Sequence, residues 1–283
     1  MEAETWWFIW QVIASAAALI GGLWLGSGPR HRAWMAYGLA MTLMGVWLWL
    51  QHHPAVGVEV MPVHLYGYFE GTGAVPFFMF NMGVLWRCSS MPRQRRVAAL
   101  AVCLGAIYFL NGGVWMLHAT PHGDLKDDPH GDVAAQSRDF SCVAAACATA
   151  LNRIARPTDD RSPGLPVMRT SEREMMYLTR TRPGFGSTIV RALEGLNYKL
   201  ERTSWEAVIL EVTFDELRTL PMPVLTPLQL SMARHHMVVV SGFLNIARNH
   251  EVTIFDPQIG AEVTLSHEDF KAAFGGQVIA FLR

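Results

Sequence analysis

Residues 136–155 read QSRDFSCVAAACATALNRIA, and this stretch decides the fold of the C-terminal half. From Cys142 to Ala155 it is rich in Ala, which predicts a helix capped by Ser141. A cysteine in the first turn of a helix lies beside unpaired backbone N–H groups and the positive end of the helix dipole. Both favour the thiolate, so this position ranks Cys142 above the other three cysteines as a nucleophile.

The remaining cysteines are expected to be structural. Cys88 and Cys103 fall in apolar segments, and Cys147, one turn deeper in the predicted helix, is expected in the core. The four spacings fit neither a disulfide framework nor a metal-ligand pattern. We therefore expect no metal and no other cofactor.

A cysteine nucleophile needs a base, a group that orients the base, and donors for the developing oxyanion. His236 opens the run HMVVV, so its ring would project from a rigid strand, whereas alternation turns His235 to the other face. Asp256 closes the next strand in the sequence FDPQIG, and hairpin pairing would bring its carboxylate to the imidazole. Gln136, six residues before Cys142, is the candidate oxyanion donor, together with the backbone N–H of Cys142.

The rest of this half is predicted to place helices before strands. The segment from Ser171 to Arg180 opens with the capping-box sequence SERE, and a third helix starts at Ser187. Five β-branched, apolar runs follow: residues 223–230, 236–243, 251–257, 262–266 and 276–282. This order predicts an α+β domain in which N-terminal helices pack on an antiparallel sheet.

In this order, the residues resemble the double-glycine leader peptidases, papain-like cysteine peptidases that often form the N-terminal domain of bacteriocin-exporting ABC transporters. In that family a Gln stands six residues before the catalytic Cys and an Ala three residues after it. A His then opens a strand of the form His-x-Val-Val-Val, and Asp-Pro follows about twenty residues later. The matching residues here are Gln136, Cys142, Ala145, His236, Val238, Val239, Val240, Asp256 and Pro257.

The resemblance covers Gln136 to Arg283, including a tail similar to the family's closing strand and helix. It implies that Cys142 attacks a peptide carbonyl, His236 transfers the proton, Asp256 orients His236, and Gln136 stabilises the oxyanion. It also implies a peptide or protein substrate and a separate exporter as partner, because no ATP-binding domain follows. This chain departs from the family at Ser141 and Val143, where an acidic residue and a Gly are usual.

The N-terminal half has a membrane-like composition. Of the ten Trp, only Trp205 lies beyond residue 120, and most charged residues lie after Leu125. A hydrocarbon core of about 30 Å needs about 20 mostly apolar residues. The predicted organisation is a four-helix transmembrane domain (1–117, with spans near 6–26, 33–51, 72–88 and 96–117), a linker (118–135) and a papain-like peptidase domain (136–283).

Loop charges predict the orientation in the membrane. Arg30 and Arg32 follow the first span, and further Arg residues surround the connection of the third and fourth, whereas residues 52–71 contain neither Lys nor Arg. Because cytoplasmic loops are enriched in Lys and Arg, both ends of the chain are expected on the outer side of a bacterial inner membrane. The N-terminus lacks the basic region and cleavage site of a signal peptide.

Other functions have less support in the sequence. A net charge of −1 gives no electrostatic reason to expect a nucleic-acid partner. The linker 118–135 contains three His and four Asp, but without the fixed spacing of a metal site. Three alternatives stay open: an inactive module that binds a leader-like peptide, a papain-like acyl transferase, and an intramembrane enzyme built on Glu70 and His64 with Asn81 nearby.

Overall fold

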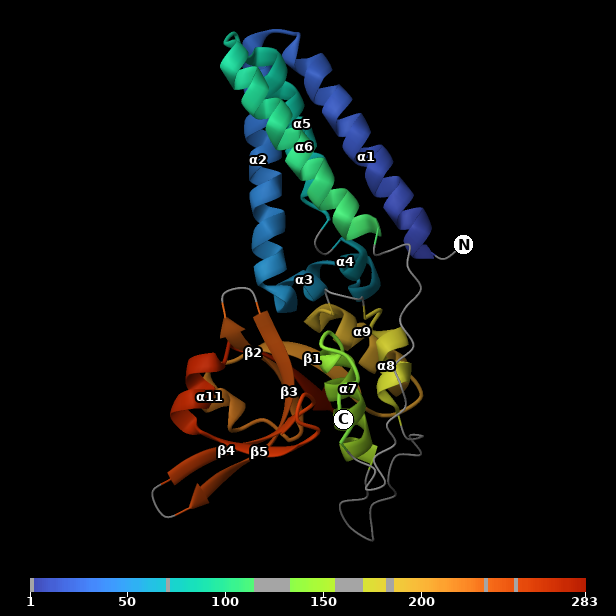
Figure 1. Ribbon diagram of the computed structural model, residues 1–283, viewed down its shortest axis with the longest axis vertical. Coiled ribbons are helices and arrows are strands. Elements are labelled where there is room, and N and C mark those ends of the chain that lie inside the picture. Colours follow the sequence, from blue (N-terminus) through green and yellow to red (C-terminus); the bar gives the residue numbers. More distant parts are fainter. Residues whose placement is uncertain are drawn as a thin grey trace. The chain divides into compact units, whose positions relative to one another are not determined.

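The chain folds into two compact units, Met1–Ala119 and Thr120–Arg283, each with its own interior. The computed structural model describes residues 3–69, 72–114, 133–155, 170–181, 186–231, 234–246 and 249–283. Figure 1 shows both units. Most of the predicted linker, residues 118–132, lies outside the described residues, so the predicted domain boundaries stay a prediction.

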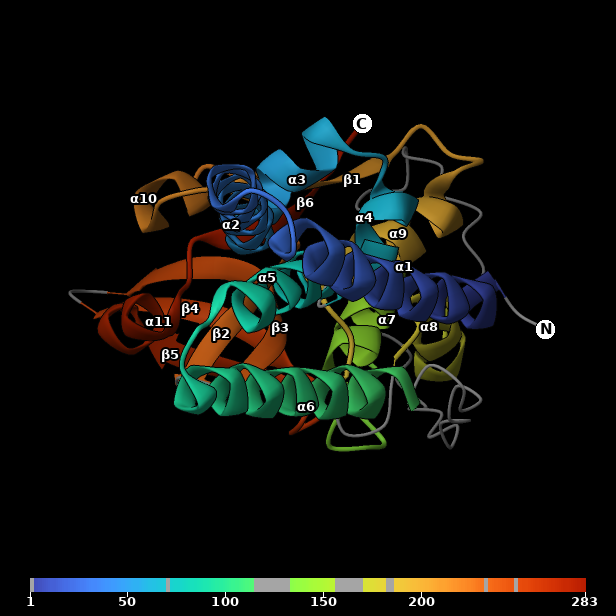
Figure 2. The same ribbon diagram turned by 90° about the horizontal axis from the view of Figure 1, so that it is seen from above.

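The N-terminal unit is helical (Figure 2). Helix α1 packs along α5, and glycines allow this close approach: a Cβ atom at Gly22 would collide with the carbonyl of Phe80, and one at Gly83 would collide with the carbonyl of Leu19. Small residues permit such backbone contact between helices. The helices are α1 (Ala3–Gly26), α2 (Arg30–His52), α3 (Pro54–Val60), α4 (Val63–Phe69), α5 (Val75–Cys88) and α6 (Pro92–Val114).

Two described helical stretches, not the predicted four, are long and apolar enough to cross a membrane: Trp6–Gly26 and Arg30–His52. The prediction of four spans is therefore corrected. Helix α5 has 14 residues and rises about 21 Å, less than a hydrocarbon core of about 30 Å. The fourth predicted span, 96–117, extends beyond the described residues, which end here at Val114.

The connection between α2 and α5 contains two short helices where the sequence suggested only a loop. Tyr66 of α4 is 1% exposed, and its hydroxyl donates to the carbonyl of Leu50 over 2.7 Å. Of the polar residues considered for an intramembrane site, Asn81 is buried in α5. Glu70 and the side chain of His64 lie outside the described residues.

The C-terminal unit is an α+β domain with an antiparallel sheet, as predicted. The strand order is β1-β6-β2-β3-β4-β5. The five predicted strands correspond to β2 through β6, whereas β1 was not predicted. The elements are α7 (Cys142–Ala155), α8 (Glu172–Leu178), α9 (Ile189–Leu200), β1 (Glu206–Glu211), α10 (Phe214–Leu217), β2 (Val224–Ser231), β3 (Arg234–Ile246), β4 (Asn249–Asp256), β5 (Ala261–Ser266), α11 (His267–Ala273) and β6 (Gln277–Leu282).

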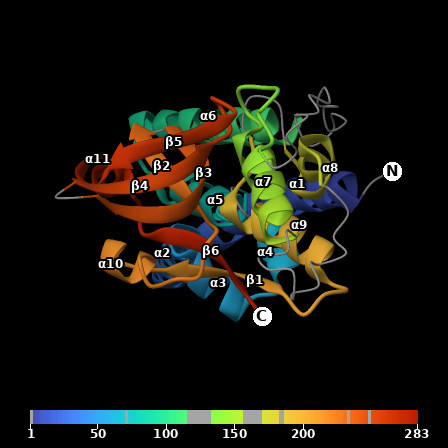
Figure 3. The same ribbon diagram turned by 90° about the horizontal axis from the view of Figure 1, so that it is seen from below.

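Helix α7 lies against β3 (Figure 3). Its alanines make this possible, since Ala144, Ala145 and Ala148 are fully buried and their small side chains admit close packing. Strand β3 in turn contributes Val238 and Val240 to a core that includes Phe270 of α11. The start of α7 is thereby fixed relative to β3.

Asn197 of α9 protects the outer edge of β1. Its side-chain amide donates to the carbonyl of Ala207 over 3.0 Å, and its side-chain oxygen accepts the N–H of Ala207 at 2.8 Å. Strand β1 pairs only with β6 in the sheet order, so these two bonds replace part of a missing strand partner.

The predicted capping box at SERE forms only in half. Ser171 accepts the backbone N–H of Glu174 at 3.2 Å, as expected of an N-cap. The carboxylate of Glu174 does not complete the reciprocal pair, because it forms an ion pair with Lys199 at 2.8 Å. A complete capping box occurs at α10, between Thr213 and Glu216.

Candidate active site

Cys142 is the first residue of α7, as predicted from the sequence. Ser141 begins the helix with its backbone, since its carbonyl accepts the N–H of Ala145 at 3.0 Å. Its hydroxyl turns away, donating to the carbonyl of Arg138 at 2.9 Å and accepting the Arg138 N–H at 3.1 Å. The predicted side-chain cap by Ser141 is therefore corrected: Ser141 orders the turn that precedes the helix.

The environment of Cys142 favours its thiolate. Burial acts to raise the pKa of the thiol, but it is outweighed by the hydrogen bond with His236, the backbone N–H groups of Met237 and Val143, and the charge of His236. The pKa of Cys142 consequently lies below its ordinary value. The Val143 N–H is one of the unpaired donors that begin a helix, as the position of Cys142 suggested.

His236 lies near the start of β3 and is 7% exposed. Burial acts to lower the pKa of its imidazole, but hydrogen bonds with Cys142 and Asp256, and the negative charges of both, raise it above the ordinary value. Its Nε2 atom lies 2.7 Å from Asp256 Oδ1. With Nε2 occupied, Nδ1 is the ring nitrogen left for the thiol.

The two opposite pKa shifts describe one coupled pair. A lowered thiol pKa and a raised imidazole pKa both favour the state in which His236 carries the proton and Cys142 is negatively charged. A thiolate is a far stronger nucleophile than a thiol, and the adjacent imidazolium is an acid for a leaving group. The pair is therefore chemically competent for attack on a carbonyl.

Asp256 is held by the turn that follows β4. Its Oδ1 accepts the N–H of Gln258 at 2.8 Å, and its carbonyl accepts the N–H of Gly260 at 2.8 Å. Gly260 has a φ of 69° and lies against Ala135, where a Cβ atom would approach to 2.8 Å. The turn thus needs glycine both for its backbone and for its contact with the segment before α7.

The same turn holds Gln136. Its backbone N–H donates to the carbonyl of Pro257 over 2.8 Å, which brings the segment before Cys142 to the residue after Asp256. The side-chain Oε1 of Gln136 is buried without a hydrogen-bond partner among the described residues. The amide nitrogen of the same side chain is the atom that an oxyanion donor would use.

The structure distinguishes His236 and Cys142 from the neighbouring residues of the same type, His235 and Cys147. His235 is exposed, whereas His236 is buried. Cys147 is completely buried, and burial followed by the charge of Cys142 raises its pKa well above the ordinary value. Glu172 was missed by the sequence analysis: it is 7% exposed, and its Oε1 accepts the N–H of Ser137 at 2.8 Å.

Within the described ranges, no group of three or more His, Cys, Asp or Glu side chains lies close enough together to hold a metal ion. Of the predicted linker, only residues 133–135 belong to these ranges.

Residues 190–283 match the peptidase C39 family. The matched region contains His236 and Asp256 and begins after Gln136 and Cys142. The resemblance to the papain-like leader peptidases is thereby confirmed. No curated protein sequence matches the chain.

Solved structures resemble this chain with low sequence identity. The peptidase domain of Streptococcus ComA, described as a bi-functional ABC transporter involved in quorum sensing, is 16% identical over 54% of this chain and 98% of that one, with a TM-score of 0.40. The ComA peptidase domain of Streptococcus mutans is 15% identical over 54% and 99%, with a TM-score of 0.35. A periplasmic domain of the EpsAB fusion protein of the Vibrio vulnificus type II secretion system is 18% identical over 46% and 48%, with a TM-score of 0.25.

Proposed function

We propose that this protein is a membrane-anchored cysteine peptidase that cleaves a leader-like peptide from an exported protein. The observation that carries the proposal is the contact of Cys142 with His236, whose other ring nitrogen lies 2.7 Å from Asp256. The match of residues 190–283 to the peptidase C39 family supports the reaction class.

The proposed reaction proceeds through an acyl-enzyme. The Cys142 thiolate attacks the peptide carbonyl carbon, and the resulting oxyanion is stabilised by the Cys142 N–H and the Gln136 side-chain amide. The His236 imidazolium gives its proton to the leaving amine as the C–N bond breaks, which leaves a thioester on Cys142. Neutral His236 then takes a proton from water, the hydroxide attacks the thioester, and the carboxylate product and the thiolate are released.

The anchor in this proposal consists of α1 and α2. Their exposed apolar side chains, among them Ile13 and Leu39, would face lipid. Arg30 and Arg32 at the start of α2 favour the cytoplasmic side for the short connection, so both chain ends would face outward. A reporter fused after Arg283 tests this: activity restricted to an exported-side reporter supports it, and activity restricted to a cytoplasmic reporter contradicts it.

The test of the enzymatic function uses the full chain in membranes and a reporter peptide with a Gly-Gly leader. Cys142→Ala and His236→Ala are expected to abolish cleavage, since each removes one half of the ion pair. His235→Ala is the matched control, because the exposed neighbour His235 should leave the rate unchanged. Cleavage that persists in Cys142→Ala would contradict the proposal.

The remaining alternatives give different products. A peptide-binding module would retain affinity for the leader peptide without cleavage and without selective alkylation of Cys142. An acyl transferase would form an amide with a second amine, which mass analysis separates from the free carboxylate of hydrolysis. An intramembrane enzyme built on Glu70 and His64 would remain active after deletion of residues 136–283.

A further inference from the structure

The segment that carries Gln136 is attached by its backbone to helices α7 and α8 and to the turn after β4. Each attachment is an N–H that donates to an acceptor distant in the sequence. They are Ala134 to Thr149 Oγ1 of α7 at 3.0 Å, Gln136 to the carbonyl of Pro257 at 2.8 Å, and Ser137 to Glu172 Oε1 of α8 at 2.8 Å. The backbone on both sides of the Gln136 side chain is thus fixed.

Glu172 is an unusual acceptor in this set. It is a carboxylate with 7% exposure, and such residues are seldom buried without a specific partner. It is the first residue of α8. Because Ser171 already caps that helix, the Glu172 side chain is not needed as a cap. A hydrogen bond from a backbone N–H to a carboxylate is roughly twice as strong as one between neutral groups.

Helix α8 is a rigid support for Glu172. At its C-terminal end the N–H of Thr181 donates to the carbonyl of Met176, and the N–H of Arg180 donates to the carbonyl of Tyr177. These two hydrogen bonds form a Schellman cap. Arg180 occupies the left-handed position with a φ of 47°, where Gly is usual. An arginine there has a structural use, because its guanidinium contacts Glu194 of α9 at 2.8 Å.

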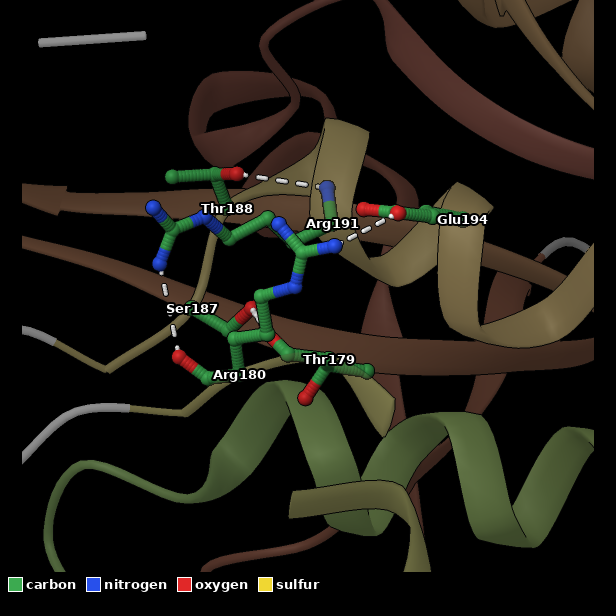
Figure 4. A network of polar contacts seen from close by, with 6 residues as sticks. All are labelled: Thr179, Arg180, Ser187, Thr188, Arg191 and Glu194. Atoms are coloured by element: carbon green, nitrogen blue, oxygen red, sulfur yellow. Dashed lines mark hydrogen bonds and ion pairs between the residues drawn. The ribbon is translucent and has the colours of Figure 1, made fainter. Parts of the chain in front are cut away.

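The polar network at this end joins α8 to α9 (Figure 4). Arg191 donates to the carbonyl of Arg180 at 3.4 Å, and the hydroxyl of Ser187 donates to the carbonyl of Thr179 at 2.6 Å. Before the N-terminal end of α8, Asn152 of α7 exchanges two hydrogen bonds with the backbone of Thr170, at 2.9 and 3.1 Å. Glu172 is therefore presented from a helix that is fastened at both ends.

We propose that Glu172 is a positioning residue, which holds the Ser137 N–H so that the Gln136 amide points at the oxyanion. The inference rests on the proposed peptidase function. Because Oε1 of Gln136 has no hydrogen-bond partner among the described residues, the direction of the amide depends on the backbone beneath it. Loss of the Glu172 acceptor would release that backbone on one side and leave the donor misplaced in the transition state.

The test uses the full chain and compares reactions that form an oxyanion with one that does not. Glu172→Ala is expected to lower kcat roughly 10- to 100-fold with little change in KM, since misplacement of about 1 Å can cost about that much. It should weaken inhibition by a capped Gly-Gly peptide aldehyde by a similar factor, because the hemithioacetal oxygen on Cys142 occupies the oxyanion position. Alkylation of Cys142 by iodoacetamide forms no oxyanion and should proceed at the wild-type rate.

Two further variants make the result specific. Glu172→Gln retains a side-chain oxygen acceptor and should recover most of the rate. In a Gln136→Ala background, Glu172→Ala should have almost no further effect, because both changes act through one donor. Equal losses with and without Gln136, or a parallel loss of iodoacetamide reactivity, would overturn the inference. A wild-type chain that neither cleaves the reporter nor binds the aldehyde would overturn the proposed function itself, and with it this inference.

Discussion

Asp256 Oδ1 lies 2.7 Å from His236 Nε2 and also accepts the backbone N–H of Gln258 at 2.8 Å. The turn after β4 thus holds the carboxylate independently of its contact with the imidazole. A partner that is fixed independently can hold the ring in one orientation and one tautomer, with Nδ1 directed to the thiol. This relationship makes Asp256 the residue whose substitution should change the pH dependence most clearly.

Asp256→Asn is expected to shift the alkaline limb of kcat/KM to lower pH. Activity requires the pair of Cys142 thiolate and His236 imidazolium, which forms above the lowered thiol pKa and is lost as pH rises through the raised His236 pKa. The Asp256 charge contributes to that raised value, so its removal lowers the His236 pKa and ends activity at lower pH. The measurement is kcat/KM against pH.

Asp256→Ala provides the comparison for this prediction. It removes the acceptor as well as the charge, so it should lower the maximal rate further than Asp256→Asn, by roughly 10-fold or more, because ring orientation is lost. An alkaline limb that stays in place or moves to higher pH in Asp256→Asn would contradict the assignment of His236 as the coupled acid.

Thiol alkylation should distinguish Cys142 from Cys147 at mildly acidic pH. Because only the thiolate reacts and the Cys142 pKa is lowered, iodoacetamide should label Cys142 at a pH where an ordinary thiol is protonated. Cys147 should remain unlabelled in the folded protein, since it is fully buried and its pKa is raised. Peptide mapping by mass spectrometry gives the result for each cysteine.

His236→Ala is the control for that experiment. Without the imidazole, the Cys142 thiolate loses the hydrogen bond that stabilises it most. Burial then acts to raise the pKa of Cys142. Labelling of Cys142 should therefore disappear at acidic pH. Exposed Cys103 of α6 is the reference, because its labelling at alkaline pH should be the same in both proteins. Labelling of Cys142 that is independent of His236 would exclude the ion pair.

The sequence predicted those parts of the fold that local patterns determine. The bounds of α7 were predicted as residues 142–155 because an Ala-rich run follows Ser141, a residue type that often caps helices. Five strands were predicted because β-branched residues are bounded by turn residues. The proximity of His236 to Asp256 could also be predicted from a local pattern, because the two residues lie on consecutive strands that form a hairpin. These inferences need only neighbours in sequence.

Features that depend on contacts between distant segments were not accessible. Glu172 appears in the sequence as part of the capping box SERE, and only the fold shows that its carboxylate reaches Ser137. Strand β1 has a glutamate at each end and pairs with the last strand, so no local hairpin signal marked it. The correction at α5 arose because an apolar run with Pro76 was counted as a span although the helix has 14 residues.

Asn197→Ala should destabilise the sheet at its β1 edge. The substitution leaves the N–H and carbonyl of Ala207 without their side-chain partners, and Ala207 is 2% exposed. Unsatisfied buried polar groups cost about 1–3 kcal/mol, and we expect the free energy of unfolding, from hydrogen exchange of β6 amides, to fall by that amount. Tyr198→Ala is the control: this neighbour is 66% exposed, and its loss should change stability by about 0.5 kcal/mol at most. Equal effects of both variants would show that Asn197 does not protect the edge.

Charge introduced on the exposed faces of α1 and α2 should release the protein from membranes. Ile13 and Leu39 are 52% and 62% exposed within the two helical stretches that are long enough to span. An arginine at the centre of a spanning helix costs about 2.5–3.5 kcal/mol of insertion free energy, so Ile13→Arg with Leu39→Arg should move the chain out of the carbonate-resistant membrane fraction. Leu230→Arg with Leu244→Arg is the matched control, because these residues of the C-terminal unit are 53% and 43% exposed and would not contact lipid in this arrangement. If carbonate extracts the wild-type chain, or if both double variants stay equally bound, α1 and α2 are not the anchor.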